Sequence, residues 1–273
     1  MKYSRTVFVI LALVLLICGG CSRVTYVYNH GDWLLRYWMN DYASFNARQK
    51  DEIRQDVADY MLWHRKHALP EYAAFLQDVY AVVDRDGALG VPDVVHVRAK
   101  ISRLYKLTVT PAIRPAAHLL STLDDRQIEE LRSTLAKKNR KERDETLSGS
   151  EQDNLGKRAK KHIHFIEDLV GHLSSEQEKQ IREMSLRIPF TTMNYIDQRE
   201  AEQAGLISLL TNHEGEDKIA EYFSQWLSTL QTPTSPQQLQ ITEAYDSAMN
   251  EMVVRIFELL TKNQKEHLLK KIK

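Results

Sequence analysis

The stretch "LSSEQEKQI", Leu173 to Ile181, has three counterparts elsewhere in the chain. These are "FNARQKDEI" from Phe45, "LDDRQIEEL" from Leu123 and "LTKNQKEHL" from Leu260. In each phrase an apolar residue precedes Ser, Thr, Asp or Asn, and Gln follows that polar residue three positions later. This is the signature of a capping box, in which the polar side chain and the Gln side chain each bond the other's backbone N–H. The phrases therefore predict helix starts with the capping pairs Asn46 and Gln49, Asp124 and Gln127, Ser174 and Gln177, and Thr261 and Gln264.

Between these phrases, apolar residues recur at intervals of three and four, as in Ile53, Val57, Tyr60, Met61 and His64. This helical period dominates and the alternation typical of strands is nearly absent, so the sequence predicts an all-α antiparallel helical bundle or helical-hairpin array. Pro70 is expected to kink or restart the second helix, and other prolines to interrupt later ones. The expected helices span 30–42, 47–84, 93–108, 112–122, 124–147, 154–172, 174–187, 190–212, 215–230, 236–260 and 261–272.

The segment "GSEQDNLG", residues 149–156, is the most turn-rich connector in the middle of the chain. It divides the chain into two halves, about 24–148 and 155–273, each of which holds two of the repeated phrases. A distant duplication would explain this arrangement. The unequal spacing of the phrases excludes a strict solenoid.

The bulk composition shows no charge bias. The 273 residues include 37 Lys and Arg against 37 Asp and Glu, so the sequence predicts no nucleic-acid partner. The strongest local excess lies at 137–161, with nine Lys or Arg against five Asp or Glu. We interpret this stretch as the solvated tip of a helical hairpin, and the alternative is contact with anionic lipid or an acidic partner. The candidates for that contact are Lys137, Lys138, Arg140, Lys141 and Arg143.

The first residues, "MKYSRTVFVILALVLLICGGCS", place Lys2 and Arg5 before a short apolar run. This pattern is typical of an export signal and is too short for a membrane-spanning helix. It resembles a bacterial lipoprotein signal, which implies that residues 1–20 are removed and Cys21 is lipidated. The rest, 21–273, is then an all-helical periplasmic domain, and Ser22 after the cysteine favours the outer membrane. The CxxC of Cys18 and Cys21 is thus no redox or metal motif.

The phrases also resemble the Leu-Thr-x-x-Gln segments of Spy- and CpxP-type periplasmic chaperones. Those proteins are small all-helical dimers that hold unfolded clients in a cradle or sense envelope stress. The resemblance implies a similar role for this chain, although the motif itself is short and degenerate.

A broader resemblance rests on the order of "YNHGDWLLRYWMNDY", "WHRKHALPEYAAFL" and "NRKERDETL". It is similar to an uncharacterised family of proteobacterial lipoproteins, which implies an anchored helical lipoprotein with no known activity. The matching positions are candidates for partner binding or for a structural motif. They include Trp33, Trp38, Trp63, His64, Arg65, Pro70 and Tyr72.

Within the second of these segments, His64, His67 and Glu71 share one helical face at a spacing that a metal site could use. The HExxH arrangement is missing, so we interpret the region as a structural Trp-His-Arg cluster and predict no metal and no cofactor. Hydrolase and phosphate-loop motifs are also missing, so we predict no enzymatic activity. Near the predicted anchor, Trp33, Tyr37 and Trp38 are interpreted as core packing of the first helix, with a membrane interface as the alternative.

The expected function is that of an interaction protein: a chaperone-like or envelope-assembly or stress factor. A concave helical face would bind unfolded or partner polypeptide through exposed apolar and Met side chains. The alternatives are a dedicated adaptor for one envelope machine, and an enzyme that uses the region from Trp63 to His67. The oligomeric state is left open.

Overall fold

The computed structural model describes residues 28, 30–85, 87–229 and 235–273. It confirms the all-α class, because the described residues form helices and no strand. The predicted signal peptide and Cys21 lie outside the described residues. No helix in the described ranges is long and apolar enough to cross a membrane. The helices are α3 (Gly31–Asn40), α4 (Ala47–Trp63), α5 (Leu69–Asp84), α6 (Val91–Val109), α7 (Ile113–Ser121), α8 (Asp125–Leu147), α9 (Glu151–Val170), α10 (Ser175–Arg187), α11 (Thr192–Thr211), α12 (Glu216–Thr229), α13 (Pro236–Leu259) and α14 (Lys262–Ile272).

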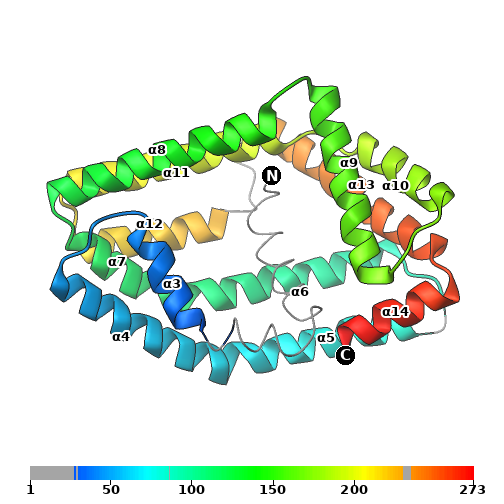
Figure 1. Ribbon diagram of the computed structural model, residues 1–273, viewed down its shortest axis with the longest axis horizontal. Helices are drawn as coiled ribbons and strands as arrows, with labels where there is room; N and C mark the ends of the chain where they lie inside the picture. The colour runs from blue at the N-terminus through cyan, green and yellow to red at the C-terminus, as the bar shows by residue number, and fades with distance from the viewer. Residues whose placement is uncertain (1–27, 29, 86, 230–234) are drawn as a thin grey trace.

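The molecule is elongated, with long helices along its two edges (Figure 1). Helices α8 and α11 lie side by side and antiparallel along one edge, while α4 and α5 follow each other along the opposite edge. Helices α3, α7 and α12 lie toward one end, and α9, α10, α13 and α14 toward the other. Neighbouring helices are largely antiparallel, as short connections between them require.

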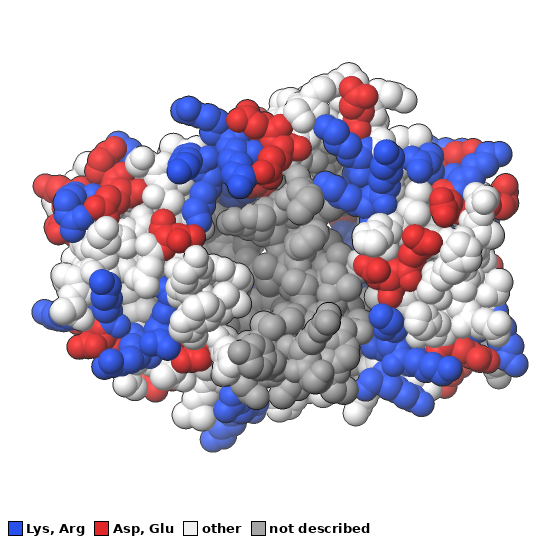
Figure 2. Space-filling model, viewed as in Figure 1, with Lys and Arg blue, Asp and Glu red and all other residues white. Residues whose placement is uncertain are grey.

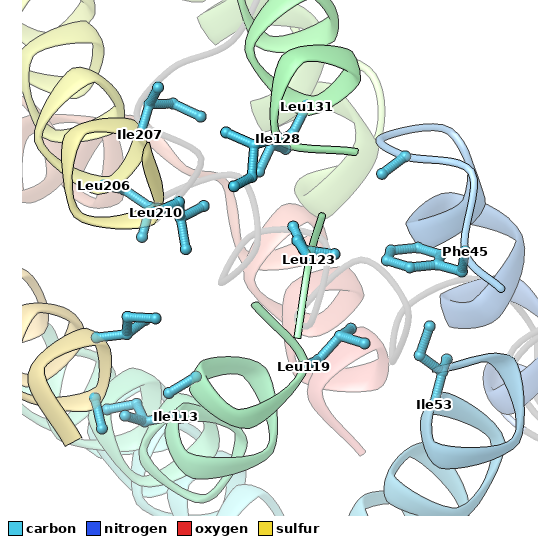
Figure 3. Packing of buried hydrophobic residues seen from close by; sticks show 14 of the residues in the cluster. Phe45, Ile53, Ile113, Leu119, Leu123, Ile128, Leu131, Leu206, Ile207 and Leu210 are labelled. Carbon is cyan, nitrogen blue, oxygen red and sulfur yellow. The ribbon is translucent and has the colours of Figure 1, made fainter. Parts of the chain in front are cut away.

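The helices pack around two core clusters of buried apolar side chains. The first draws on Ala43, Phe45, Ile53, Val57, Ile113, Ala117, Leu119, Leu123, Ile128, Leu131, Leu206, Ile207, Leu210, Ile219, Ala220 and Leu227, and its side chains from α4, α7, α8 and α11 point toward one another (Figure 3). The second draws on Leu89, Val94, Ile163, Ile166, Val170, Leu173, Ile181, Ile188, Met252, Phe257 and Leu260. The apolar residue that opens each repeated phrase is buried in one of these clusters, because it precedes the helix cap and points inward.

The expected break at Pro70 takes the form of a π-helical turn. The segment His64–Ala68 is π-helical, and the Leu69 N–H donates to the His64 carbonyl. Pro70 lies in the first turn of α5, where its missing N–H costs no hydrogen bond. Helices α4 and α5 therefore follow each other without a loop, and the chain changes direction between them (Figure 1).

The turn-rich connector at 149–156 is shorter than expected, because the helix expected from residue 154 begins three residues earlier, at Glu151. Helix α9 begins at Glu151 because Ser150 and Asp153 form another capping box. The Ser150 N–H donates to Asp153 Oδ2 at 3.0 Å. A carboxylate there does what Gln does in the repeated phrases, and Gly156 is simply carried inside the helix.

Candidate functional site

Each predicted capping pair forms both hydrogen bonds of a capping box. At the start of α10, the Gln177 N–H donates to Ser174 Oγ at 3.2 Å, and the Ser174 N–H donates to Gln177 Oε1 at 2.9 Å. The same two bonds form at the starts of α4, α8 and α14. The Nε2 group of each Gln takes no part in the capping box and is therefore available for hydrogen bonds to other segments.

Hydrogen bonds between these Gln side chains join the phrases in pairs. Gln49 Nε2 donates to Gln127 Oε1 at 3.1 Å, and Gln127 Nε2 donates back to Gln49 Oε1 at 2.7 Å. Each Nε2 also donates to the carbonyl just before the partner phrase, at Thr122 for Gln49 and at Ser44 for Gln127. Both Gln side chains are buried, and every polar atom of the two amides is hydrogen-bonded.

The second pair repeats this pattern. Gln177 Nε2 donates to Gln264 Oε1 at 2.8 Å and Gln264 Nε2 donates to Gln177 Oε1 at 3.1 Å. The carbonyls of Leu259 and His172 accept the remaining hydrogens, each at 2.8 Å. The repeated phrase is thus a docking element that joins one helix start to another. The sequence shows which residues cap a helix, but it carries no signal for which phrases meet.

Two of the three segments that carry the broader family resemblance, those that contain Tyr28 and His64, meet around His64. The Tyr28 hydroxyl lies 3.0 Å from His64 Nδ1, and the Arg65 guanidinium lies over the Tyr28 ring at 5.6 Å. The rings of Tyr60 and Tyr72 lie 6.0 Å and 5.5 Å from the His64 ring. We call Tyr28, Tyr60, His64, Arg65 and Tyr72 the aromatic cluster. It fixes the beginning of the described chain to the junction of α4 and α5.

Apart from the Arg65 guanidinium, the aromatic cluster consists of neutral groups. Burial lowers the pKa of His64, and burial raises the pKa of Tyr60 to about 12 and that of Tyr72 above its usual value. The hydroxyls of Tyr60 and Tyr72 are held by the carbonyl and the hydroxyl of Thr108. Because the hydroxyls of Tyr28, Tyr60 and Tyr72 are all bonded within the molecule, the cluster is suited to holding the chain in place.

The side chains weighed as metal ligands are used in other contacts. His67 stacks on Trp63 with ring centres 6.0 Å apart, and Glu71 lies 3.8 Å from Arg103. His64 points to Tyr28. Across the described part of the chain, no group of three His, Cys, Asp or Glu side chains is placed to hold a metal ion.

The core interpretation of Trp33, Tyr37 and Trp38 is wrong. These side chains are 58%, 55% and 53% exposed, and Trp33 and Tyr37 stack with ring centres 5.5 Å apart. Helix α3 instead packs on the first core cluster through Leu35 and Met39. A short helix at the end of a bundle has one inner side, and smaller residues occupy it here.

Three of the five candidate basic residues of α8 make ion pairs within the chain. Lys138 lies 3.7 Å from Asp41, Lys141 lies 3.8 Å from Glu145, and Arg143 binds acidic residues of α11. Lys137 and Arg140 are exposed. Figure 2 shows both signs of charge interspersed over the described part of its face. The local excess of positive charge is therefore largely offset by acidic neighbours.

The structure contains a polar cluster at the C-terminal end of α10 that no sequence motif predicts. Buried Arg158 donates to the backbone carbonyls of Ser185 and Pro189 at 2.7 Å and 2.9 Å. The Ser185 hydroxyl lies 2.8 Å from His162 Nδ1. Burial and the Arg158 charge lower the pKa of His162 to about 4. Ser185 is fully buried, so this Ser and His pair binds helices together and is not open to a substrate.

Exposed apolar side chains also lie on the packed helices α6 and α13. Val91 and Val95 are on α6, and Val253 is on α13. Their helical spacing places the valines on the same sides as Arg98 and Asp246, which form an ion pair between the two helices. We call these five residues the α6–α13 face.

Comparison with known proteins identifies one family. A family model described as a family of unknown function, DUF6279, matches residues 41–235, which include α4 through α12 and most of the aromatic cluster. No curated protein and no solved structure matches this chain. Because the match covers more than half of the 273 residues, the chain belongs to the DUF6279 family.

Proposed function

We propose that this protein is a lipid-anchored envelope protein that binds polypeptides without catalysing a reaction, as a chaperone-like, assembly or stress factor. The first residues support an anchor, because a short charged and apolar segment precedes Cys21. Ser22 supports an outer-membrane location with the helical body in the periplasm. The likeness of the repeated phrases to periplasmic chaperones supports the same role.

The observation that carries polypeptide binding is the α6–α13 face. Val91, Val95 and Val253 are exposed on two packed helices beside the Arg98 and Asp246 ion pair. Apolar side chains bordered by charge suit extended or partly unfolded segments, which offer both apolar side chains and unpaired backbone groups. Met193 of α11 is a further exposed apolar residue.

Photo-crosslinking in living cells tests this proposal. A photoreactive amino acid at Val95 or Val253 of the anchored protein should capture envelope polypeptides that mass spectrometry identifies. Glu221, exposed on α12, is the matched control position and should capture few. Many unrelated adducts at Val95 and Val253 would support a chaperone-like role, whereas one dominant partner would make the protein a dedicated adaptor. Equal adducts at Glu221 and Val95 would contradict the α6–α13 face as the binding surface.

Two other variants distinguish the enzymatic alternative from polypeptide binding. His64→Ala and His67→Ala should leave crosslinking at Val95 unchanged, provided that the variants retain the parent's helical circular-dichroism spectrum. Substrate turnover or a bound metal lost on these substitutions would support an enzyme at the segment from Trp63 to His67.

A further inference from the structure

Helix α3 presents an outward aromatic side, which consists of Trp33, Tyr37 and Trp38. All three rings are more than half exposed, although Trp and Tyr bury more apolar area than most side chains. The opposite side of α3 packs on the first core cluster through Leu35 and Met39. The helix is therefore fixed on the body with its largest apolar groups turned outward.

The start of the chain places this helix close to the predicted anchor. Tyr28 is held to the body by His64 and Arg65, and α3 begins at Gly31. Tyr28 is seven positions after Cys21, so even a fully extended chain between them spans at most about 25 Å. If Cys21 carries lipid, Tyr28 and α3 cannot lie far from the bilayer surface.

We infer that the outward aromatic side of α3 lies in the headgroup region of the bilayer to which Cys21 is attached. Indole and phenol rings combine an apolar ring with a polar N–H or O–H, and they gather where a bilayer meets water. A further exposed apolar residue, Leu62, lies at the end of α4 near the start of α3, because the preceding residue, Met61, lies against Gly31. The contact would hold the body in one orientation, because lipid at Cys21 alone leaves it free to rotate.

Charge contributes little to this contact. Helix α3 contains one Arg and one Asp, and Arg36 pairs with Asp32 at 3.0 Å. We therefore expect α3 to bind the bilayer through its aromatic rings, with little dependence on anionic lipid. It rests on the proposed lipid anchor, so its test must report on that anchor separately.

Fluorescence quenching in vesicles provides the test. The chain has four tryptophans, at 33, 38, 63 and 226. The full lipidated chain is reconstituted in vesicles of phosphatidylethanolamine, phosphatidylglycerol and brominated phosphatidylcholine. A variant with Trp63→Phe and Trp226→Phe retains the α3 tryptophans, and its matched control with Trp33→Phe and Trp38→Phe retains the other two. Circular dichroism checks that both variants keep the parent's fold.

The α3 tryptophans should be quenched by roughly twofold or more relative to the control pair, as expected for rings at the bilayer interface. The effect should persist when phosphatidylcholine replaces phosphatidylglycerol, and its loss would overturn an aromatic contact in favour of a charged one. Equal quenching in both variants, with acylated Cys21 confirmed by mass spectrometry, would overturn the inference and leave the anchor intact. An unacylated Cys21 would overturn the anchor and the inference together. Tryptophans shielded in cells but not quenched by brominated lipid would assign α3 to a polypeptide partner instead.

Discussion

A buried amide is costly unless each of its polar atoms is hydrogen-bonded, and the paired glutamines satisfy this condition in two places. In each pair, Oε1 accepts from its own helix cap and from the partner, while Nε2 donates to the partner and to a backbone carbonyl. The repeated phrase thus unites a local cap and a tertiary contact in a single side chain. A shorter Asp can complete the box, as Asp153 does at the start of α9, but it lacks the amide N–H that each Gln donates to its partner.

Substitution of these glutamines should reveal the shared contact. Gln177→Ala and Gln264→Ala should each lower the free energy of unfolding by about 2–4 kcal/mol, since a cap is lost and a buried amide loses its partner. The double variant should cost less than the sum of the two, because both substitutions break the same bonds. Urea denaturation followed by circular dichroism measures all three.

Gln180→Ala is the control, because Gln180 bonds Glu176 at the surface of the same helix and its loss should change stability by less than about 0.5 kcal/mol. Strictly additive costs for Gln177 and Gln264 would contradict the pairing. Loss of polypeptide binding with unchanged melting would contradict the capping role.

The lowered pKa of His162 predicts acid sensitivity. Its pKa is about 4 in the folded protein against 6.5 for an ordinary histidine. As pH falls through 6.5 the unfolded chain binds a proton that the folded chain does not, so stability decreases until pH 4, by about 3 kcal/mol in total. His64 contributes in the same direction.

His162→Gln should therefore flatten the decrease of the urea midpoint between pH 6.5 and pH 4. Exposed His164, which lies 3.8 Å from Asp168, provides the control His164→Gln, which should follow the parent's profile. An unchanged slope in His162→Gln would show that the buried imidazole does not control acid stability.

At the scale of elements, α8 and α11 are joined by a row of polar contacts along their antiparallel length. Asn139 bonds Gln203 at 2.6 Å, and Arg143 bonds Glu200 at 2.8 Å. Between them, Arg199 donates to Glu142 at 2.5 Å, and both side chains are nearly fully buried. Buried charges favour one register of the two helices, because any other register leaves a charge unpaired.

Removal of one charge of the Arg199 and Glu142 pair should lower the free energy of unfolding more than removal of both charges. Arg199→Met should lower the free energy of unfolding by about 3–5 kcal/mol, since Glu142 is left buried without its partner. Adding Glu142→Leu should recover much of that loss. Lys141→Met, an exposed control that breaks a pair with Glu145 within α8, should cost less than about 1 kcal/mol. A double variant no more stable than Arg199→Met would refute this account.

At the scale of the whole molecule, the paired phrases and the core clusters divide the chain differently. The first Gln pair lies within 24–148 and the second within 155–273. The first core cluster, however, includes residues of α11 and α12, and the second includes Leu89 and Val94. A common origin of the two halves stays a prediction, but neither half holds a complete core.

A fragment of residues 24–148 is accordingly expected to unfold without a cooperative transition when produced alone. It lacks the side chains of α11 and α12 that complete the first core cluster. Mixing it with 155–273 should restore helical signal and cooperative melting, as circular dichroism would record. A fragment that melts alone at the temperature of the full chain would disprove the interdependence.

The order of residues alone predicts the helical class and nearly every helix, including the helix starts at Asn46, Asp124, Ser174 and Thr261. These features depend on hydrogen bonds between residues three or four positions apart, which the order of residues displays directly. The repeated phrase does not predict the helix start at Ser150, because Asp153, and not Gln, completes the capping box there.

Three features follow from the packing of distant segments: which glutamines pair, the outward direction of Trp33 and Trp38 on α3, and the ion pairs of Arg143 with α11. Each outcome depends on residues distant in sequence, and the helical period gives a side chain's direction around its helix but not the neighbour that meets it. The candidate site divides in the same way: the residues around His64 could be singled out from the sequence, whereas their contact with Tyr28 required the fold.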